Sequence, residues 1–153
     1  MKDLSRKRLL VREVITSGKI FLKDETIQKI AEKKVEEGDV LAQAEIAGIN
    51  AAKQTYGLIP RCVQIPIEGI DITFDIQDKY IEVRTMVRAT AKSGVELESM
   101  IATSVALTTI LQMIKNDEED EDGQFPDVWI TDIRIIKKIR RSPQLPSSFI
   151  AVD

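Results

Sequence analysis

Two neighbouring stretches of alternating apolar and polar residues most constrain the fold of this chain. Residues 70–77 and 81–89 each repeat with a period of two, which is the period of a half-buried β-strand. The short segment "QDK" lies between them and predicts a turn, so the two strands should form an antiparallel hairpin. Residues 95–115 then change to helical spacing, with an apolar stripe that runs from Leu97 to Leu111.

Four further segments complete the predicted secondary structure. Residues 24–34 and 40–55 have helical spacing, and small residues crowd the second segment, which lets its backbone pack closely against a neighbour. Strands are predicted near residues 62–67 and at residues 128–139. This order predicts an α+β fold, with an antiparallel sheet covered on one face by two main helices.

Length and composition fit one folded domain. The chain has 153 residues, 43% of them hydrophobic, and no stretch approaches the roughly 18 uninterrupted apolar residues of a membrane span. We expect a single domain over residues 1–142 and a mobile tail over residues 143–153. We also expect a soluble, cytoplasmic protein with no membrane partner.

The absence of histidine limits the possible chemistry. Without it, the chain lacks the usual general base near neutral pH and the commonest metal ligand, and Cys62 is its only cysteine. We therefore expect no metal and no cofactor. Six of the 25 acidic residues form the run 117–122, and without them the net charge of −3 becomes +3. This balance does not exclude nucleic acid, but we do not expect it as a partner.

Glu96 and Glu98 stand at the start of the predicted helix 95–115, shortly after Gly94. Acidic residues in a first turn interact favourably with the helix dipole, so the pair has a purely structural explanation. The alternative is that both carboxylates belong to a catalytic site. The residues alone leave these two interpretations open.

Several other polar residues also allow two interpretations. Lys53, in the helix 40–55, is either a partner of the helix dipole or a ligand of an anion. Gln112 and Lys115 lie three residues apart on one helix face, which an ordinary surface pair would explain. The basic segment "KKIRR" at 137–141 either binds phosphate or is a solvated strand end, and the second reading is favoured.

Five segments that together cover almost all of the chain carry a resemblance to a known family. They are "DLSRKRLLVREVITSG" (3–18), "EEGDVLAQAEIAGINAAKQT" (36–55), "LIPRCVQIPIE" (58–68), "KSGVELESMIATSVALTTI" (92–110) and "IRIIKKI" (133–139). In this order and at this spacing they resemble the molybdenum cofactor biosynthesis protein C (MoaC) family, the cyclic pyranopterin monophosphate synthases.

The resemblance implies both a fold and an activity. It implies a ferredoxin-like α+β subunit in a hexamer built as a trimer of dimers, with the active site near a dimer interface. Family members convert the GTP-derived small molecule 3′,8-cyclo-7,8-dihydro-GTP into cyclic pyranopterin monophosphate and release pyrophosphate. This reaction needs cationic side chains for the triphosphate and acid–base groups that open and rebuild the purine ring.

The resemblance also implies site residues. Carried over residue by residue, the retained catalytic positions of the family fall on Lys53, Glu96, Glu98 and Lys115. Val63 stands in place of the histidine in the family's "LCHP" segment, and Gln112 stands in place of the aspartate in its "YDM" segment. Arg61 adds a positive charge beside Val63, so we expect Lys53, Lys115 and Arg61 to bind substrate phosphate.

These two replacements predict a degenerate active site. Valine has no titratable group and glutamine accepts no proton usefully, whereas one general acid or base typically contributes about 10²- to 10⁴-fold to the rate. We therefore expect a MoaC-like lyase with impaired or lost catalysis. Cys62 or an intact paralogue in a mixed oligomer could supply the missing groups. Otherwise the chain is an inactive paralogue that serves as a nucleotide-binding module or as an assembly subunit, whose tail "SSFIAVD" would add a strand to a neighbour.

Overall fold

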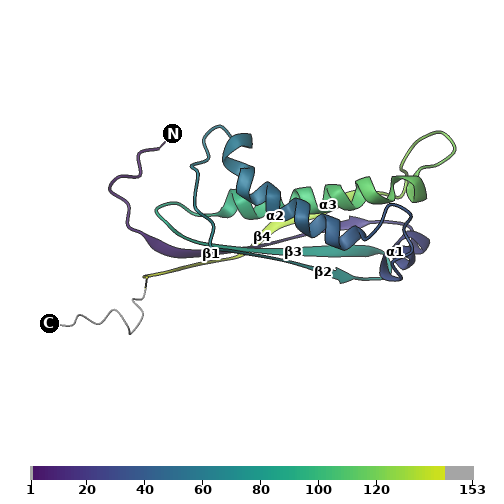
Figure 1. Ribbon diagram of the computed structural model, residues 1–153, viewed down its shortest axis with the longest axis horizontal. Coiled ribbons are helices and arrows are strands. Elements are labelled where there is room, and N and C mark those ends of the chain that lie inside the picture. Colours follow the sequence, from purple (N-terminus) through teal and green to yellow (C-terminus); the bar gives the residue numbers. More distant parts are fainter. Residues whose placement is uncertain (1, 144–153) are drawn as a thin grey trace.

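The computed structural model describes residues 2–143, so the predicted tail from residue 144 onward lies outside the described residues. The elements follow in the order β1 (Leu10–Phe21), α1 (Asp24–Ala31), α2 (Val40–Leu58), β2 (Gly69–Ile76), β3 (Tyr80–Ala91), α3 (Glu96–Glu118) and β4 (Trp129–Arg141). The strands form one sheet in the order β2-β3-β1-β4, and every neighbouring pair is antiparallel. The two long helices, α2 and α3, lie on one face of this sheet and α1 lies at one end of it (Figure 1), which confirms the predicted ferredoxin-like α+β fold.

Strand β1 was not predicted, although it is a central strand of the sheet. Its helix-facing positions include the buried Thr16 and Gly18, and these polar and small residues interrupt the apolar alternation that would identify a strand. The strand predicted near residues 62–67 was wrong, because this segment is an irregular connection. Pro66 has no N–H for a sheet hydrogen bond, and Ile65 and Ile67 are instead partly buried against the core.

The small residues of α2 and β1 allow close packing between layers. A Cβ atom at Gly48 would come within 2.5 Å of Ile72 Cδ1 and 3.1 Å of the Ala102 carbonyl oxygen. A Cβ atom at Gly18 would lie 2.8 Å from Leu107 Cδ1. Helix α2 therefore packs closely against both β2 and α3, as its small residues predict, and α3 packs closely against β1.

A cluster of four buried hydroxyls, which we call the hydroxyl cluster, joins α3 to the sheet. Its members are Thr16, Thr85, Ser99 and Thr103, none of which is exposed. The Thr16 hydroxyl donates to the Ser99 carbonyl at 3.0 Å and lies 2.9 Å from Ser99 Oγ, and Thr103 donates to Thr85 Oγ1 at 3.0 Å. Because buried polar groups are costly without partners, these bonds fix the first turns of α3 on β1 and β3.

The sheet has an aromatic end, which we define by Phe21, Tyr80 and Trp129. The rings of Phe21 and Trp129 stack with centroids 4.5 Å apart, and the Tyr80 ring lies 5.2 Å from that of Phe21. The last turn of α3 lies at this end, because the buried carboxylate of Glu118 accepts a hydrogen bond from the Lys23 backbone N–H at 3.1 Å. The Glu118 carboxylate thus supplies α1 with a cap that its own N-cap residue, Lys23, does not provide.

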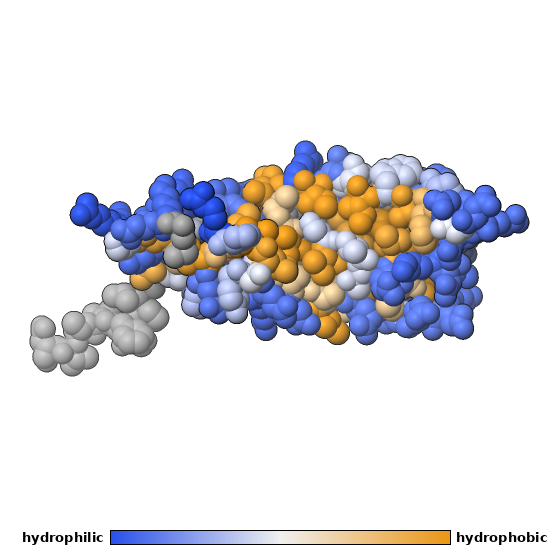
Figure 2. All heavy atoms as spheres, turned by 90° about the horizontal axis from the view of Figure 1, so that it is seen from above, coloured by the Kyte–Doolittle hydropathy of each residue, from blue (hydrophilic) through white to orange (hydrophobic). Residues whose placement is uncertain are grey.

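The outer face of α2 and α3 is markedly apolar. Figure 2, which looks down on the helices, shows apolar side chains gathered along the middle of the molecule between hydrophilic ends. Ile46 and Leu58 of α2 and Leu97 of α3 are all more than two-fifths exposed. Helix α3 is long and apolar enough to cross a membrane, but its other face is packed in the core, as in a soluble protein.

Candidate active site

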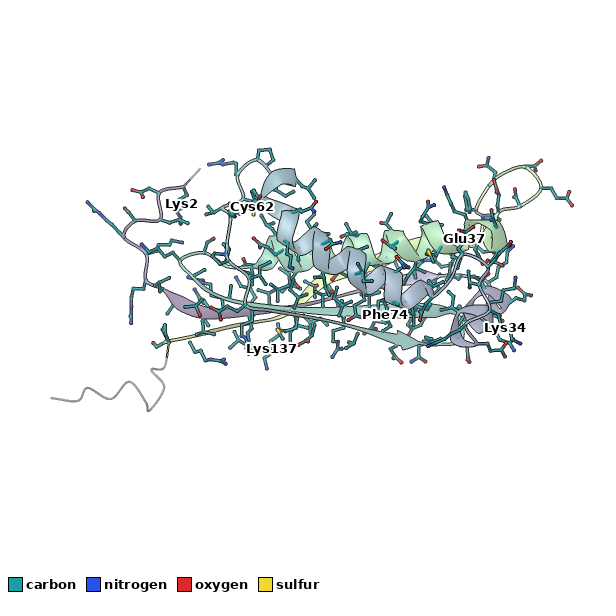
Figure 3. The ribbon with its side chains drawn as sticks, in the orientation of Figure 1. Lys2, Lys34, Glu37, Cys62, Phe74 and Lys137 are labelled. Atoms are coloured by element: carbon teal, nitrogen blue, oxygen red, sulfur yellow. The ribbon has the colours of Figure 1, made fainter. Side chains whose placement is uncertain are left out.

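A cavity of about 170 Å³ lies at the start of α3, at the end of the molecule opposite the aromatic end. Its walls come from the amino-terminal segment 2–7, the connection 61–65 and the turn 93–98. Figure 3 shows Lys2 and Cys62, which belong to two of these walls, at the same end of the molecule. The cavity therefore joins three parts of the chain that are far apart in sequence.

Glu96, in the first turn of α3, is held by a cation from the sheet. Lys138 of β4 places its Nζ 2.5 Å from Glu96 Oε1. Burial alone would raise the pKa of Glu96, but the hydrogen bond from Lys138 and the positive charges of Lys138 and Arg12 hold it below its ordinary value. A Cβ atom at Gly94 would overlap this carboxylate, so glycine is required there for the observed position of Glu96.

Glu98 has a different environment, although it lies only two residues further along. Its side chain is 97% buried, since only 3% is exposed, and Oε1 accepts a hydrogen bond from the Cys62 thiol at 3.4 Å. Oε2 has no hydrogen-bond partner among residues 2–143. Burial raises the pKa of Glu98 above its ordinary value, so its protonated form persists to higher pH than in an exposed glutamate.

Cys62 donates to Glu98 as a protonated thiol. Burial, followed by the negative charge of Glu98, raises the Cys62 pKa to about 11. Near neutral pH this group is therefore a neutral hydrogen-bond donor and not a thiolate nucleophile. The two carboxylates of the opening turn thus differ in chemistry: Glu96 is a stabilised anion and Glu98 is a group able to hold a proton.

The described chain brings together four of the predicted site residues and separates the others. Glu96, Glu98, Arg61 and Val63 all line the cavity. Gln112 and Lys115 are exposed further along α3, and Lys115 lies 17 residues after Glu98, which corresponds to about 25 Å along a helix. Lys53 is exposed on α2 and does not line the cavity.

The sequence prediction missed three cations near the carboxylates. Lys2 and Lys7 line the cavity, and Lys138 pairs with Glu96. The basic beginning of the chain and the "KKIRR" segment were the available signals, but neither pointed to the glutamates. For the segment that contains Lys138, the sequence predicted either phosphate binding or a solvated strand end. The structure shows instead that Lys138 forms an ion pair with a carboxylate of the candidate site. Within the described part of the chain, no group of three or more His, Cys, Asp or Glu residues could hold a metal ion.

Comparison with known proteins gives consistent results. A sequence model of the MoaC family matches residues 1–140. The "probable cyclic pyranopterin monophosphate synthase" of Pyrococcus furiosus is 49% identical over 140 residues, which cover 92% of this chain and 90% of the relative. The protein of the same description from Sulfolobus acidocaldarius is 46% identical over 92% of this chain and 98% of the relative.

A third relative has a different description. The "probable cyclic pyranopterin monophosphate synthase accessory protein" of Methanothermobacter thermautotrophicus is 46% identical over 138 residues. These residues cover 90% of this chain and 87% of the relative. Relatives described as synthases and one described as an accessory protein are therefore similar to this chain to nearly the same degree.

Proposed function

The chain belongs to the MoaC family, and we propose that it acts in molybdenum cofactor biosynthesis at the step of cyclic pyranopterin monophosphate formation. We propose further that its cavity receives 3′,8-cyclo-7,8-dihydro-GTP and that catalysis at this site is impaired or lost. The observation that carries this proposal is the cavity itself, where Glu96 and Glu98 stand beside Val63. Anionic and proton-holding groups are present there, and the family's histidine is not.

Glu98 is the residue best suited to acid–base chemistry. Its raised pKa and its place in the cavity wall favour proton exchange with a bound ligand, and Oε2 is the oxygen that has no hydrogen-bond donor among residues 2–143. The Cys62 thiol donates to the other oxygen and so orients the carboxyl group. Glu96 is bound to Lys138 and contributes a fixed negative charge that would position a polar group of the substrate.

The replaced positions argue for weak or absent turnover. Each general acid or base is worth about 10²- to 10⁴-fold, which corresponds to roughly 3 to 5 kcal/mol of barrier. Val63 lines the cavity without a titratable group, and Gln112 lies far along α3. Losses of residues that act as a unit do not add, so the two replacements together need not cost more than the larger one.

We propose that the complete site requires a second chain. A cavity of about 170 Å³ is smaller than the roughly 300–1,000 Å³ of ordinary small-molecule sites. Lys115 and Glu98 occupy opposite ends of α3, so a two-fold axis across the helical face would bring Lys115 of one chain towards Glu98 of the other. The apolar outer surface of α2 and α3 supports such a contact. The resulting oligomer would be a hexamer, as a trimer of dimers, or a mixed oligomer with an intact paralogue.

A second candidate function is that of a non-catalytic partner. The relative described as an accessory protein favours it, as do Val63 and Gln112. In this role the chain would bind nucleotide or support the assembly of an active paralogue. In either role we propose a single domain over residues 1–142 and a cytoplasmic location.

A single-turnover assay tests the catalytic proposal. Pyrophosphate release from 3′,8-cyclo-7,8-dihydro-GTP would be followed with the unaltered chain and with the Val63→His, Gln112→Asp double variant. We expect little or no release by the unaltered chain and a gain in the double variant, which the further change Glu98→Gln should abolish. Rapid release by the unaltered chain would disprove impaired catalysis. If neither protein released pyrophosphate, this would argue that the cavity is not an active site and would favour the accessory role.

The assembly proposal is tested separately. Ile46 is 54% exposed on the outer face of α2, so Ile46→Glu should leave the fold intact while opposing association through this face. Light scattering should show a smaller assembly for this variant than for the unaltered chain. An unchanged mass would place the interface elsewhere.

A further inference from the structure

Three cations line the cavity without a partner. Lys2, Lys7 and Arg61 are all exposed wall residues, and none forms an ion pair within the part of the chain that the structure describes. The one fixed anion of the cavity, Glu96, is paired with Lys138 and with none of these three cations. Like charges gathered at one small cavity repel one another, so this arrangement favours the binding of an anion from solution.

Two of these cations belong to the segment 2–9, which precedes β1 and has no regular secondary structure. The segment is attached to the body of the molecule at its middle, where Lys92 Nζ donates to the Ser5 carbonyl at 3.3 Å. A turn closed by the Lys7 N–H and the Leu4 carbonyl, at 3.0 Å, brings Lys7 back towards the cavity, and Leu4 also lines it. The segment therefore passes along the cavity as a strap.

Glu98, which also lines the cavity, offers a second, independent sign of a ligand. Glu98 is 97% buried, and its Oε2 has no donor in the described chain although a buried carboxylate oxygen normally has one. A ligand that carries both an anionic group and an N–H or O–H donor would satisfy the cations of the strap and Glu98 Oε2 together. Phosphorylated nucleosides have this combination.

We propose that segment 2–9 is a phosphate-binding strap, in which Lys2 and Lys7 hold the phosphate chain of a nucleotide against Arg61 while Glu98 accepts a hydrogen bond from the rest of the ligand. This inference rests on the proposed function, because it assigns the phosphate subsite of the same cavity. It differs from the sequence prediction in that Lys2 and Lys7 bind the phosphates next to Arg61, in place of Lys53 and Lys115.

Calorimetry with inorganic tripolyphosphate tests the strap without requiring turnover. The test variant is Lys2→Ala, Lys7→Ala, and the matched control is Arg6→Ala, Arg8→Ala, which removes two charges from the same segment but not from the cavity wall. Hydrogen bonds to a charged group are stronger than neutral ones and two of them are removed, so we expect affinity at least about tenfold weaker in the test variant. The control should bind almost as the unaltered chain does.

Other outcomes overturn the strap. The strap is rejected if the unaltered chain does not bind tripolyphosphate, or if the test variant binds it with unchanged affinity. It is also rejected if the test and control variants lose affinity equally, because equal losses would show that only the total charge of the segment matters. Pyrophosphate release that appears in the Val63→His, Gln112→Asp variant and is insensitive to the further change Lys2→Ala, Lys7→Ala would retain the cavity as the proposed substrate site and reject the strap. Tripolyphosphate binding that depends on these lysines, with no release by the unaltered chain or by the Val63→His, Gln112→Asp variant, would retain the strap and reject the cavity as an active site.

A proteolysis experiment gives an independent readout. Tripolyphosphate should slow cleavage by trypsin after Lys7 and Arg8, while cleavage after the exposed Lys33 should continue at its original rate. Equal rates at Lys7 with and without tripolyphosphate would overturn the strap.

Discussion

Glu98→Gln and Glu96→Gln, at the start of α3, should change the free energy of unfolding in opposite directions. The pKa of Glu98 is higher in the folded chain than in the unfolded chain, because burial disfavours the charged carboxylate. Its contribution to stability is therefore present below the unfolded-state pKa and is lost as the pH rises to the folded-state pKa. Glu98→Gln should therefore become more stabilising, relative to the unaltered chain, as the pH rises. The relative gain should grow by about 1.4 kcal/mol per pH unit and level off at the folded pKa.

Glu96→Gln provides the matched comparison. The folded-state pKa of Glu96 is lowered, so its contribution is present above the unfolded pKa and is lost as the pH falls through the folded value. The Lys138–Glu96 pair is partly exposed, so its removal should cost only about 0.2–1 kcal/mol, and this loss should be constant between pH 6 and 8.

Urea unfolding of the three proteins at several pH values between 4 and 8 measures both effects. The difference between Glu98→Gln and the unaltered chain should increase as the pH rises from the ordinary glutamate pKa to the folded pKa of Glu98, whereas the difference for Glu96→Gln should be constant between pH 6 and 8. A pH-independent difference for Glu98→Gln, or a variant that becomes less stable with rising pH, would refute the argument that burial raises the Glu98 pKa. The pH at which the difference levels off would give that pKa directly.

Three further predictions concern packing, the hydroxyl cluster and the thiol. Gly48→Ala should destabilise the fold by about 1–3 kcal/mol in urea unfolding, because the new methyl group would overlap Ile72 and approach the Ala102 carbonyl; an unchanged midpoint would show that α2 can move away. Thr16→Val keeps the shape but removes the hydroxyl that contacts Ser99, so it should cost about 1–3 kcal/mol and lower the melting temperature by about 2–4 °C per kcal/mol. A calorimetric scan that shows no shift would contradict this. Alkylation of Cys62 at pH 7.5 should be about two orders of magnitude slower than that of an unperturbed cysteine, because a pKa near 11 leaves little thiolate; an ordinary rate would disprove this environment.

Periodicity predicted the elements whose core positions are mostly apolar. Strand β3 places Ile81, Val83 and Val87 in the core, and its alternation was recognised together with that of β2 although the hydroxyl of Thr85 is also buried there. Strand β1 was not recognised, because two of its successive inward positions are not apolar side chains: Thr16 belongs to the hydroxyl cluster and Gly18 makes room for α3. Both residues are explained only by the partner layer, which no pattern within one segment can show.

The residues of the candidate site that the sequence predicted are likewise those that a short segment can identify. Glu96, Glu98, Arg61 and Val63 were found because each lies within a short segment that resembles the family, and the structure brings these segments together. Lys2 and Lys7 reach the cavity through the course of the amino-terminal segment, and Lys138 reaches Glu96 through the pairing of β4 with β1. Such positions depend on tertiary structure. Lys115 shows the converse difficulty, because the resemblance names it together with Glu98 although the two residues lie far apart along α3 in one chain.

The stacked pair at the aromatic end has a spectroscopic consequence. Trp129 is the only tryptophan of the chain, and its ring stacks on Phe21 at the end of the molecule that carries the last turn of α3. Its fluorescence emission is therefore a single-site signal, and a ligand confined to the cavity of the same chain lies too far away to contact the indole. In the proposed oligomer, a nucleotide held by a neighbouring subunit near the Lys115 end of α3 would change this emission, whereas a nucleotide that only fills the cavity of the same chain would leave it unchanged.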